Sequence, residues 1–141
     1  MKNNMESSLY TLSTRGLAGA NLLIVEDNYL LLMDLEAVLL GAGAGGVQPC
    51  RTIEDALRLS ETEGISAAIL DVRIGADSIA PVARKLAARG TPFLFYTGQL
   101  GNDPMMTEWQ NCKTISKPAL PHVIVKAVAE LLRAKVEPAH H

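Results

Sequence analysis

Five short runs with the character of strands, some of them wholly apolar, alternate along this chain with segments of helical periodicity, and polar or turn-forming residues follow each run. The runs are Leu22–Val25, Val47–Cys50, Ala67–Leu70, Pro92–Tyr96 and Lys113–Ser116. Strands that alternate with helices predict a doubly wound α/β fold around a parallel sheet. Proline cannot donate to a strand ladder, so Pro49 places the second strand at an edge. With right-handed crossovers, the predicted order of the five strands is 2-1-3-4-5.

The segments between the runs predict helices of unequal strength. Tyr29–Leu40 is apolar enough to be a largely buried helix, and Gly41 suits a left-handed residue just after its end. Thr52 has the character of an N-cap for a helix that continues toward Gly64. The remaining helices are predicted from Ile79 to Gly90, weakly over Pro104–Gln110, and over Pro121–Ala134.

The 141 residues suit one domain, predicted over residues 20–135. A flexible N-terminal extension, residues 1–19, is expected before it, with a short helical piece near Leu9–Leu12, and residues 136–141 form a C-terminal tail. The net charge of −2 and the 20% of charged residues predict no nucleic-acid surface. No apolar run approaches the roughly 18 residues of a membrane span, and the N-terminus lacks a secretory pattern. A cytoplasmic location is therefore expected.

Polar residues follow four of the predicted strands directly or end them. Glu26 and Asp27 follow the first strand, Asp71 the third, Thr97 the fourth and Lys117 the fifth. Ligands of open parallel sheets bind beyond the carboxyl ends of the strands, so these five side chains should share one rim. Each of them has an ordinary alternative role, as a helix cap, a turn hydroxyl or a solvated lysine. Their coincidence at one rim favours a functional site.

The chemistry of this set points to phosphoryl transfer. Two carboxylates about 5 Å apart repel by roughly 3 kcal/mol at an effective dielectric constant of 20. A hard divalent cation removes that repulsion, and Mg²⁺ commonly binds one or two carboxylates together with phosphate oxygens. A lysine and a hydroxyl would hold the phosphate as charge and hydrogen-bond donor. Together with a carboxylate nucleophile, they predict transfer of a phosphoryl group to an aspartate.

The motifs at this rim resemble those of response-regulator receiver domains, the CheY-like group of the flavodoxin-type fold. The matching motifs are Leu23–Asp27, Ile69–Asp71, Tyr96–Gly98 and Ser116–Pro118, in the same order and on the same strands. The resemblance spans about Ala20 to Lys135. The segment Pro92–Gly98 further resembles a bacterial stand-alone subgroup with a Phe-x-Thr-Gly signature. The chain then has no room for an attached output domain.

The resemblance assigns a role to each residue of the site. Asp71 would accept the phosphoryl group, and Thr97 and Lys117 would bind its oxygens. Glu26, Asp27, Asp71 and the backbone carbonyl of Arg73 would hold Mg²⁺. In receivers the bond equivalent to Lys117–Pro118 is cis, which proline makes accessible at a cost of about 1 kcal/mol.

The same resemblance implies a signalling protein rather than a conventional enzyme. It would assist its own Mg²⁺-dependent phosphorylation and autodephosphorylation. The phosphodonor would be a sensor histidine kinase or a histidine phosphotransfer protein, and the phosphorelay would continue to an unidentified downstream protein. A homodimer remains open, and no membrane partner is implied.

Two departures from the receiver pattern affect the expected output. Thr114 stands where most receivers have an aromatic residue, and Ala119 stands where most have phenylalanine. We therefore expect phosphorylation to reorder residues 98–111 instead, with Trp109 as a reporter. Arg73 and Gln99 are further expected to flank the path of an attacking water, Arg73 as a shield and Gln99 as an orienting group.

Three rival functions fit the sequence less well. An aspartyl phosphatase or phosphotransferase would want a second carboxylate two residues after Asp71, where the chain has Arg73. A dinucleotide-binding domain would want a glycine-rich turn after the first strand, where the chain has Glu26–Asn28. A receiver-like interaction module that is never phosphorylated remains as the third, and phosphorylation in vitro distinguishes it.

Overall fold

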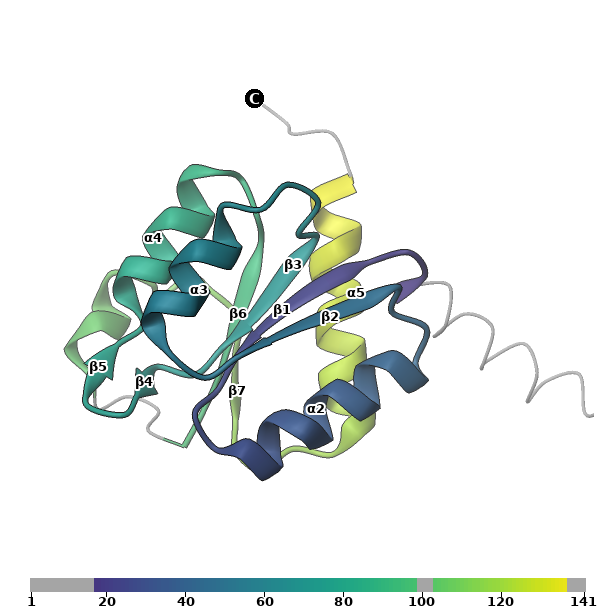
Figure 1. Cartoon of the computed structure of the whole chain (residues 1–141), viewed down its shortest axis with the longest axis horizontal. Helices are drawn as coiled ribbons and strands as arrows, with labels where there is room; N and C mark the ends of the chain where they lie inside the picture. The colour runs from purple at the N-terminus through teal and green to yellow at the C-terminus, as the bar shows by residue number, and fades with distance from the viewer. Residues whose placement is uncertain (1–16, 99–102, 137–141) are drawn as a thin grey trace, which may run out of the picture.

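A five-stranded parallel sheet forms the centre of the molecule in the computed structural model, which describes residues 17–98 and 103–136 (Figure 1). The strands are β1 (Asn21–Val25), β2 (Gly46–Cys50), β3 (Ala67–Leu70), β6 (Phe93–Thr97) and β7 (Thr114–Ser116). Their order is β2-β1-β3-β6-β7, which confirms the predicted doubly wound order and the edge position of the strand that contains Pro49.

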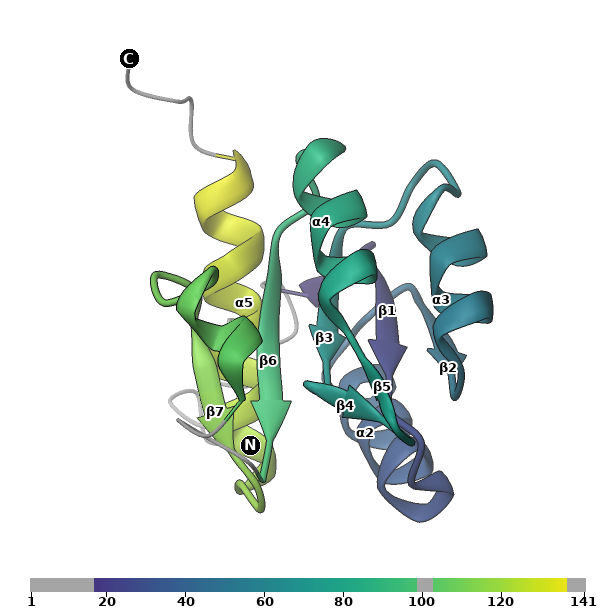
Figure 2. The ribbon, with the colours of Figure 1, turned by 90° about the vertical axis from the view of Figure 1, so that its left-hand side faces the viewer.

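Two pairs of helices cover the two faces of the sheet (Figure 2). Helices α2 (Tyr29–Gly41) and α5 (Pro121–Val136) lie on one face, and α3 (Ile53–Ser60) and α4 (Ala80–Ala88) on the other. Neighbouring residues of one strand therefore belong to different cores, as expected for a period of two. Ile24 packs in the α2/α5 layer, whereas Leu23 and Val25 pack in the α3/α4 layer. A strand with both faces covered is apolar throughout, which explains the unbroken runs in the sequence.

Helix α2 differs from the prediction of a largely buried helix. Only one side is buried, through Leu32, Leu35 and Leu39, while Leu30 is 77% exposed. The high apolar content of the segment gave no information on which side faces water. The predicted left-handed residue is also displaced, since Gly41 belongs to the helix and Gly43 has the positive φ, 106°.

The start of α3 agrees more closely with the prediction of Thr52 as its N-cap. The Thr52 side chain accepts a hydrogen bond from the Asp55 N–H at 3.1 Å at the start of α3. The Asn28 side chain caps α2 in the same way, through the Leu31 N–H at 3.1 Å. Asn28 is thus the capping residue of the Glu26–Asn28 motif, which leaves the two carboxylates for other contacts.

Between β3 and α4 the chain forms a hairpin that the sequence analysis did not predict. Strands β4 (Arg73–Ile74) and β5 (Asp77–Ser78) pair antiparallel, with Gly75 at a φ of 62° in the turn. The hairpin begins two residues after Asp71 and lies beside the carboxyl ends of the central strands (Figure 2). The weak helix predicted over Pro104–Gln110 is a short 3₁₀ helix, η1 (Pro104–Thr107), followed by turns.

Packing begins before the predicted start of the domain at Ala20. Leu17 is fully buried in the α2/α5 layer, and Ala18 forms an isolated bridge with Ala44. The helical piece predicted near Leu9–Leu12, the loop residue Gln99 and most of the tail lie outside the described residues. Within the described ranges, no helix combines the length and apolar character that crossing a membrane requires.

Candidate functional site

The predicted site residues meet at the carboxyl ends of four parallel strands. Glu26 and Asp27 follow β1, Asp71 follows β3, Thr97 is the last residue of β6, and Lys117 follows β7. The strand register explains the convergence, because Val25 pairs with Leu70 and Thr97 pairs with Ser116. The main chain continues this alignment past β1, since the Asp71 N–H donates to the Val25 carbonyl at 3.0 Å.

Lys117 links the carboxylates of the first and third strands. Its Nζ donates to Glu26 Oε1 at 2.7 Å and to Asp71 Oδ2 at 2.8 Å. Glu26 is 2% exposed and Asp71 is 8% exposed, so both carboxylates need such a partner inside the protein. Glu26 gains a second donor, because its Oε2 accepts from the Asn28 N–H at 3.0 Å. The Lys117–Pro118 peptide bond is cis, as predicted.

Glu26, Asp27 and Asp71 can also present oxygens to a single cation. One ligand atom from each carboxylate lies within 4.8 Å of the other two. The donors are hard oxygens from three different side chains, which is the ligand type that Mg²⁺ prefers. One lysine among three carboxylates leaves an excess of negative charge at the rim, so the donor set fits a divalent cation.

The ionisation of the linked pair follows from its burial and its hydrogen bonds. Burial raises the pKa of Glu26 above its ordinary value, and the nearby charge of Asp71 adds to this, while Lys117 and the Asn28 N–H act in the opposite direction. Burial alone would lower the pKa of Lys117, but its hydrogen bonds to Asp71 and Glu26 outweigh burial and raise it. A raised pKa makes Glu26 harder to ionise, which opposes an ion pair with Lys117. A raised pKa keeps Lys117 protonated, which favours the pair. The two short contacts of Nζ favour a charged Lys117.

Arg73 is near the site, but its side chain points to a different partner from the one expected. It begins strand β4, and its Nε donates to Asp103 Oδ2 at 2.5 Å. Its Nη1 lies 3.4 Å from the Ala76 carbonyl. The guanidinium is therefore engaged by η1 and its own hairpin, an arrangement that the expected shield over Asp71 did not include.

Tyr96 is a site residue that the sequence analysis missed. It is buried in β6 immediately before Thr97, and its hydroxyl accepts from the Ala119 N–H at 3.1 Å. Lys117 Nζ lies 5.8 Å from the centre of the Tyr96 ring. Tyr96 thus holds the segment that carries Lys117. Its place beside Thr97 in an otherwise apolar strand was the available signal, because a buried phenol needs a polar partner.

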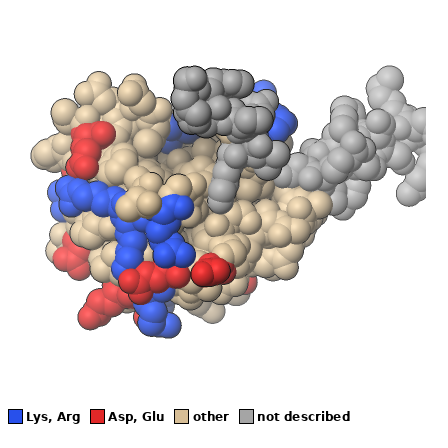
Figure 3. All heavy atoms as spheres, turned by 90° about the horizontal axis from the view of Figure 1, so that it is seen from above, with Lys and Arg blue, Asp and Glu red and all other residues tan. Residues whose placement is uncertain are grey.

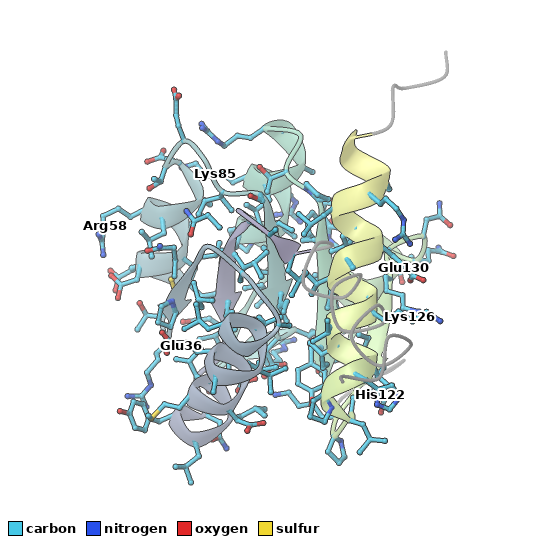
Figure 4. All side chains as sticks on the ribbon, turned by 90° about the vertical axis from the view of Figure 1, so that its right-hand side faces the viewer. Glu36, Arg58, Lys85, His122, Lys126 and Glu130 are labelled. Carbon is cyan, nitrogen blue, oxygen red and sulfur yellow. The ribbon has the colours of Figure 1, made fainter. Side chains whose placement is uncertain are left out.

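Hollows in the described part of the molecule include one at the acidic cluster formed by Glu26, Asp27 and Asp71, and one away from it. A pocket of about 340 Å³ borders Asp27 between the hairpin and the start of α3, with Arg51 and Thr52 in its wall. A groove of about 530 Å³ runs between the edge strand β7 and α5. His122, Lys126 and Glu130, which line this groove, project from α5 in Figure 4.

The end of the molecule opposite the site carries charges of both signs. Figure 3 views this end and shows basic and acidic side chains side by side. Lys85 of α4 pairs with Glu61 after α3, and Arg84 Nη2 lies 3.1 Å from Glu108 Oε1. Exposed ion pairs of this kind contribute little to stability, and we interpret this end of the molecule as a solvated surface.

Comparisons with solved structures place this fold among known proteins. SdrG from Sphingomonas melonis Fr1 shares 38% identity with the chain at a TM-score of 0.70, over 81% of this chain and 97% of SdrG. A response regulator receiver protein from Sinorhizobium medicae WSM419 gives 22% identity, a TM-score of 0.71, and 83% and 97% coverage. No family model and no curated protein sequence matches the chain.

A third solved structure of this fold contains a bound metal ion. It is the receiver domain of a sensor histidine kinase from Pseudomonas aeruginosa PAO1, solved with a magnesium ion coordinated in its active-site cleft. This domain shares 22% identity with the chain at a TM-score of 0.69, over 82% of the chain and 99% of the domain. The likeness shows a common fold.

Proposed function

Because this chain belongs to the receiver domains of response regulators, we propose that it accepts a phosphoryl group on Asp71 from a phosphohistidine. The observation that carries the proposal is the bridge from Lys117 to both Asp71 and Glu26 at the acidic cluster. We propose that the protein acts as a single-domain response regulator in a cytoplasmic phosphorelay.

Asp71 supplies the nucleophile in this reaction. Its Oδ2 accepts from Lys117, so we assign the attack on phosphorus to Oδ1. As the new P–O bond forms, the P–N bond of the phosphohistidine breaks and its electron pair stays on the imidazole nitrogen, which then takes up a proton. Lys117 remains beside the phosphoryl oxygens as a positive charge, and the Thr97 hydroxyl, at the end of the adjacent strand, donates to one of them.

Glu26, Asp27 and Asp71 are the proposed magnesium ligands, with the backbone carbonyl of Arg73 as a further one. When bound, the ion would offset the negative charge of the phosphoryl group and of the carboxylates. Glu26 accepts hydrogen bonds from Lys117 Nζ and the Asn28 N–H, and both act to lower its pKa against the effect of burial. Asp27 is oriented by the Gly75 N–H, which donates to its Oδ2 at 2.8 Å.

An apolar surface beside the site is the proposed docking face for the phosphodonor protein. Its residues are the exposed side chains Tyr29, Leu30 and Met33 of α2 with Leu120 and Val123 at the start of α5. The two helices contact each other and begin near the same end of the sheet (Figure 1). Tyr29 follows Glu26 by three residues and Leu120 follows Lys117 by three. A histidine domain packed here would place its imidazole near Asp71.

Phosphorylation by acetyl phosphate tests the acceptor directly. Intact mass spectrometry should show one added phosphate on the parent protein with Mg²⁺, and none on Asp71→Asn or after chelation of the metal. Asp55→Asn is the matched control, because Asp55 is an exposed carboxylate of α3 that pairs with Arg58. This variant should be modified like the parent.

The result also separates the proposal from the alternative of a receiver-like module that is never phosphorylated. A parent protein that stays unmodified with excess donor and Mg²⁺, while a control receiver is labelled, would contradict phosphorylation at Asp71. Phosphorylation of Asp71→Asn to the same extent as the parent would show that the acceptor is a residue other than Asp71.

A further inference from the structure

The β4–β5 hairpin is fastened on both sides by carboxylates from other parts of the chain. On one side Asp27 Oδ2 accepts from the Gly75 N–H at 2.8 Å. On the other side Asp103 Oδ2 accepts from Arg73 Nε at 2.5 Å. The base of the hairpin is closed by the Ile79 N–H, which donates to the Val72 carbonyl at 3.0 Å. The hairpin therefore spans the distance between the acidic cluster and η1.

Asp103 joins this hairpin to the start of η1 with its two oxygens. Oδ2 binds Arg73, and Oδ1 accepts from the Met105 N–H at 3.1 Å as the N-cap of η1. The Asp103 side chain is only 4% exposed, whereas that of Arg73 is 39% exposed. A carboxylate this deeply buried is strongly unfavourable without a charged partner, so Arg73 determines where Asp103 and the first turn of η1 can lie.

The segment that begins at Asp103 packs against the α3/α4 layer through partly buried side chains, among them Met105 and Trp109. Trp109 packs edge-on against Phe93, with ring centroids 5.4 Å apart, but its buried Nε1 has no hydrogen-bond partner among the described residues. The contact between Glu108 and Arg84 is exposed at both ends. A short 3₁₀ helix followed by turns, with a buried donor that has no described partner, belongs to the less stable parts of a fold, where a small bias changes the populated state.

We propose that Asp103, acting through Arg73, is a positioning residue that couples metal binding at the acidic cluster to the conformation of η1. This inference rests on the magnesium site of the proposed function. Asp27 is both a proposed metal ligand and the acceptor for the Gly75 N–H. A change in the position of its carboxylate on metal binding therefore displaces the hairpin, and the Arg73–Asp103 ion pair transmits that displacement to η1 and Trp109.

The test is an NMR titration with Mg²⁺ alone, which needs no phosphodonor or partner. The Gly75 amide reports on the metal side of the hairpin, and the Trp109 indole N–H reports on η1. In the parent protein both resonances should shift with the same apparent Kd. In Asp103→Asn, which keeps a capping oxygen but loses the charge, Gly75 should still shift and Trp109 should lose most of its shift.

Three further variants separate coupling from a general effect on packing. Arg73→Gln should also lose most of the Trp109 shift, and Arg73→Lys, which keeps a cation, should recover part of it. Glu108→Gln is the matched control, because it removes the ion pair between Arg84 and the end of the same segment without touching the hairpin. Both resonances should respond to Mg²⁺ in this control as in the parent.

The outcomes distinguish the inference from the function on which it rests. A parent in which Gly75 does not respond to Mg²⁺ contradicts the metal site, and the coupling falls with it. A parent in which Gly75 shifts and Trp109 does not overturns the coupling alone. Equal Trp109 shifts in the parent, Asp103→Asn and Arg73→Gln also overturn it, while leaving the metal site and phosphorylation of Asp71 intact.

Discussion

Tyr96 connects strand β6, which carries Thr97, to the loop after β7, which carries Lys117. Its ring is part of the α2/α5 core, while its hydroxyl reaches the main chain just past Lys117. The Ala119 N–H donates to that hydroxyl at 3.1 Å. One phenol oxygen thus anchors the loop that places Nζ between Glu26 and Asp71.

We expect Tyr96→Phe to lower the free energy of unfolding by about 1 kcal/mol, because the Ala119 N–H loses its acceptor while the ring packing is kept. Chemical denaturation measures this difference. Phosphorylation by acetyl phosphate should also slow, since Lys117 is less well held. Tyr29→Phe is the control, because the Tyr29 ring is 53% exposed and lies beside Arg51 rather than in the core. Equal stability of the two variants would exclude this role for the Tyr96 hydroxyl.

The site residues that could be predicted from the sequence are those that stand at the carboxyl ends of predicted strands. Glu26, Asp71 and Lys117 each stand directly after a predicted strand, and parallel strands bring such positions to one rim. Asp103 could not be found this way. Its contact with Arg73 joins positions 30 apart through side-chain directions that no periodicity encodes. Even the side chain of Arg73, whose place near Asp71 was predicted, has a partner that only the fold shows.

At the scale of elements, helix α2 shows what periodicity can and cannot determine. Its bounds were predicted to within one residue, because an apolar segment between Asn28 and a glycine-rich stretch has clear ends. Its orientation was not, since apolar residues occupy both sides and only contact with the sheet selects the buried one. The β4–β5 hairpin was missed for a related reason. Its strands have two residues each, too few to produce a pattern.

The exposed side of α2 leads to a prediction about phosphotransfer from a protein donor. We expect Leu30→Ser to slow phosphorylation by the phosphorylated histidine kinase that serves the parent best in a panel, on the order of tenfold, or about 1.4 kcal/mol. Its reaction with acetyl phosphate should be unchanged, because this small donor needs no docking surface and the Leu30 side chain is exposed to solvent.

Leu40→Ser is the control for this helix. Leu40 is 45% exposed and lies ten residues further along α2, about 15 Å from Leu30. Radiolabel transfer from the kinase measures both variants. A similar loss in both would mean that general apolar character, rather than the docking face beside the site, sets the rate. No loss in Leu30→Ser would remove this surface from the donor complex.

At the scale of the whole molecule, the sheet divides the described core into two apolar layers that have no buried side chain in common. The α2/α5 layer includes Leu17, which precedes the predicted start of the domain and is fully buried. The sequence before Ala20 is mostly polar, and Leu17 lies between Gly16 and Gly19 with only Ala18 as an apolar neighbour, so it gives no periodic signal. The order of the strands was predictable because the rules for edge strands and crossovers apply to the whole sheet. The packing of Leu17 against the α2/α5 layer was not predictable, because no such rule covers it.

We expect Leu17→Ala to lower the free energy of unfolding by about 2–4 kcal/mol, because it removes a fully buried leucine and leaves a cavity. Leu120→Ala, at a side chain that is 64% exposed, should change it by less than about 0.5 kcal/mol. Urea denaturation of both variants provides the comparison. A loss for Leu17→Ala as small as that for Leu120→Ala would place Leu17 outside the cooperative core.

The proline in strand β2 has a consequence for how copies of this protein behave at high concentration. The Cys50 carbonyl accepts from the Glu26 N–H, so the backbone of the preceding residue, Pro49, faces away from β1. Its missing N–H therefore costs the sheet no internal bond. It does remove a donor that a foreign strand would need to align with this edge. At the other edge β7 has only three residues. Neither border of the sheet offers a long template, and this limits sheet-to-sheet aggregation in a crowded solution.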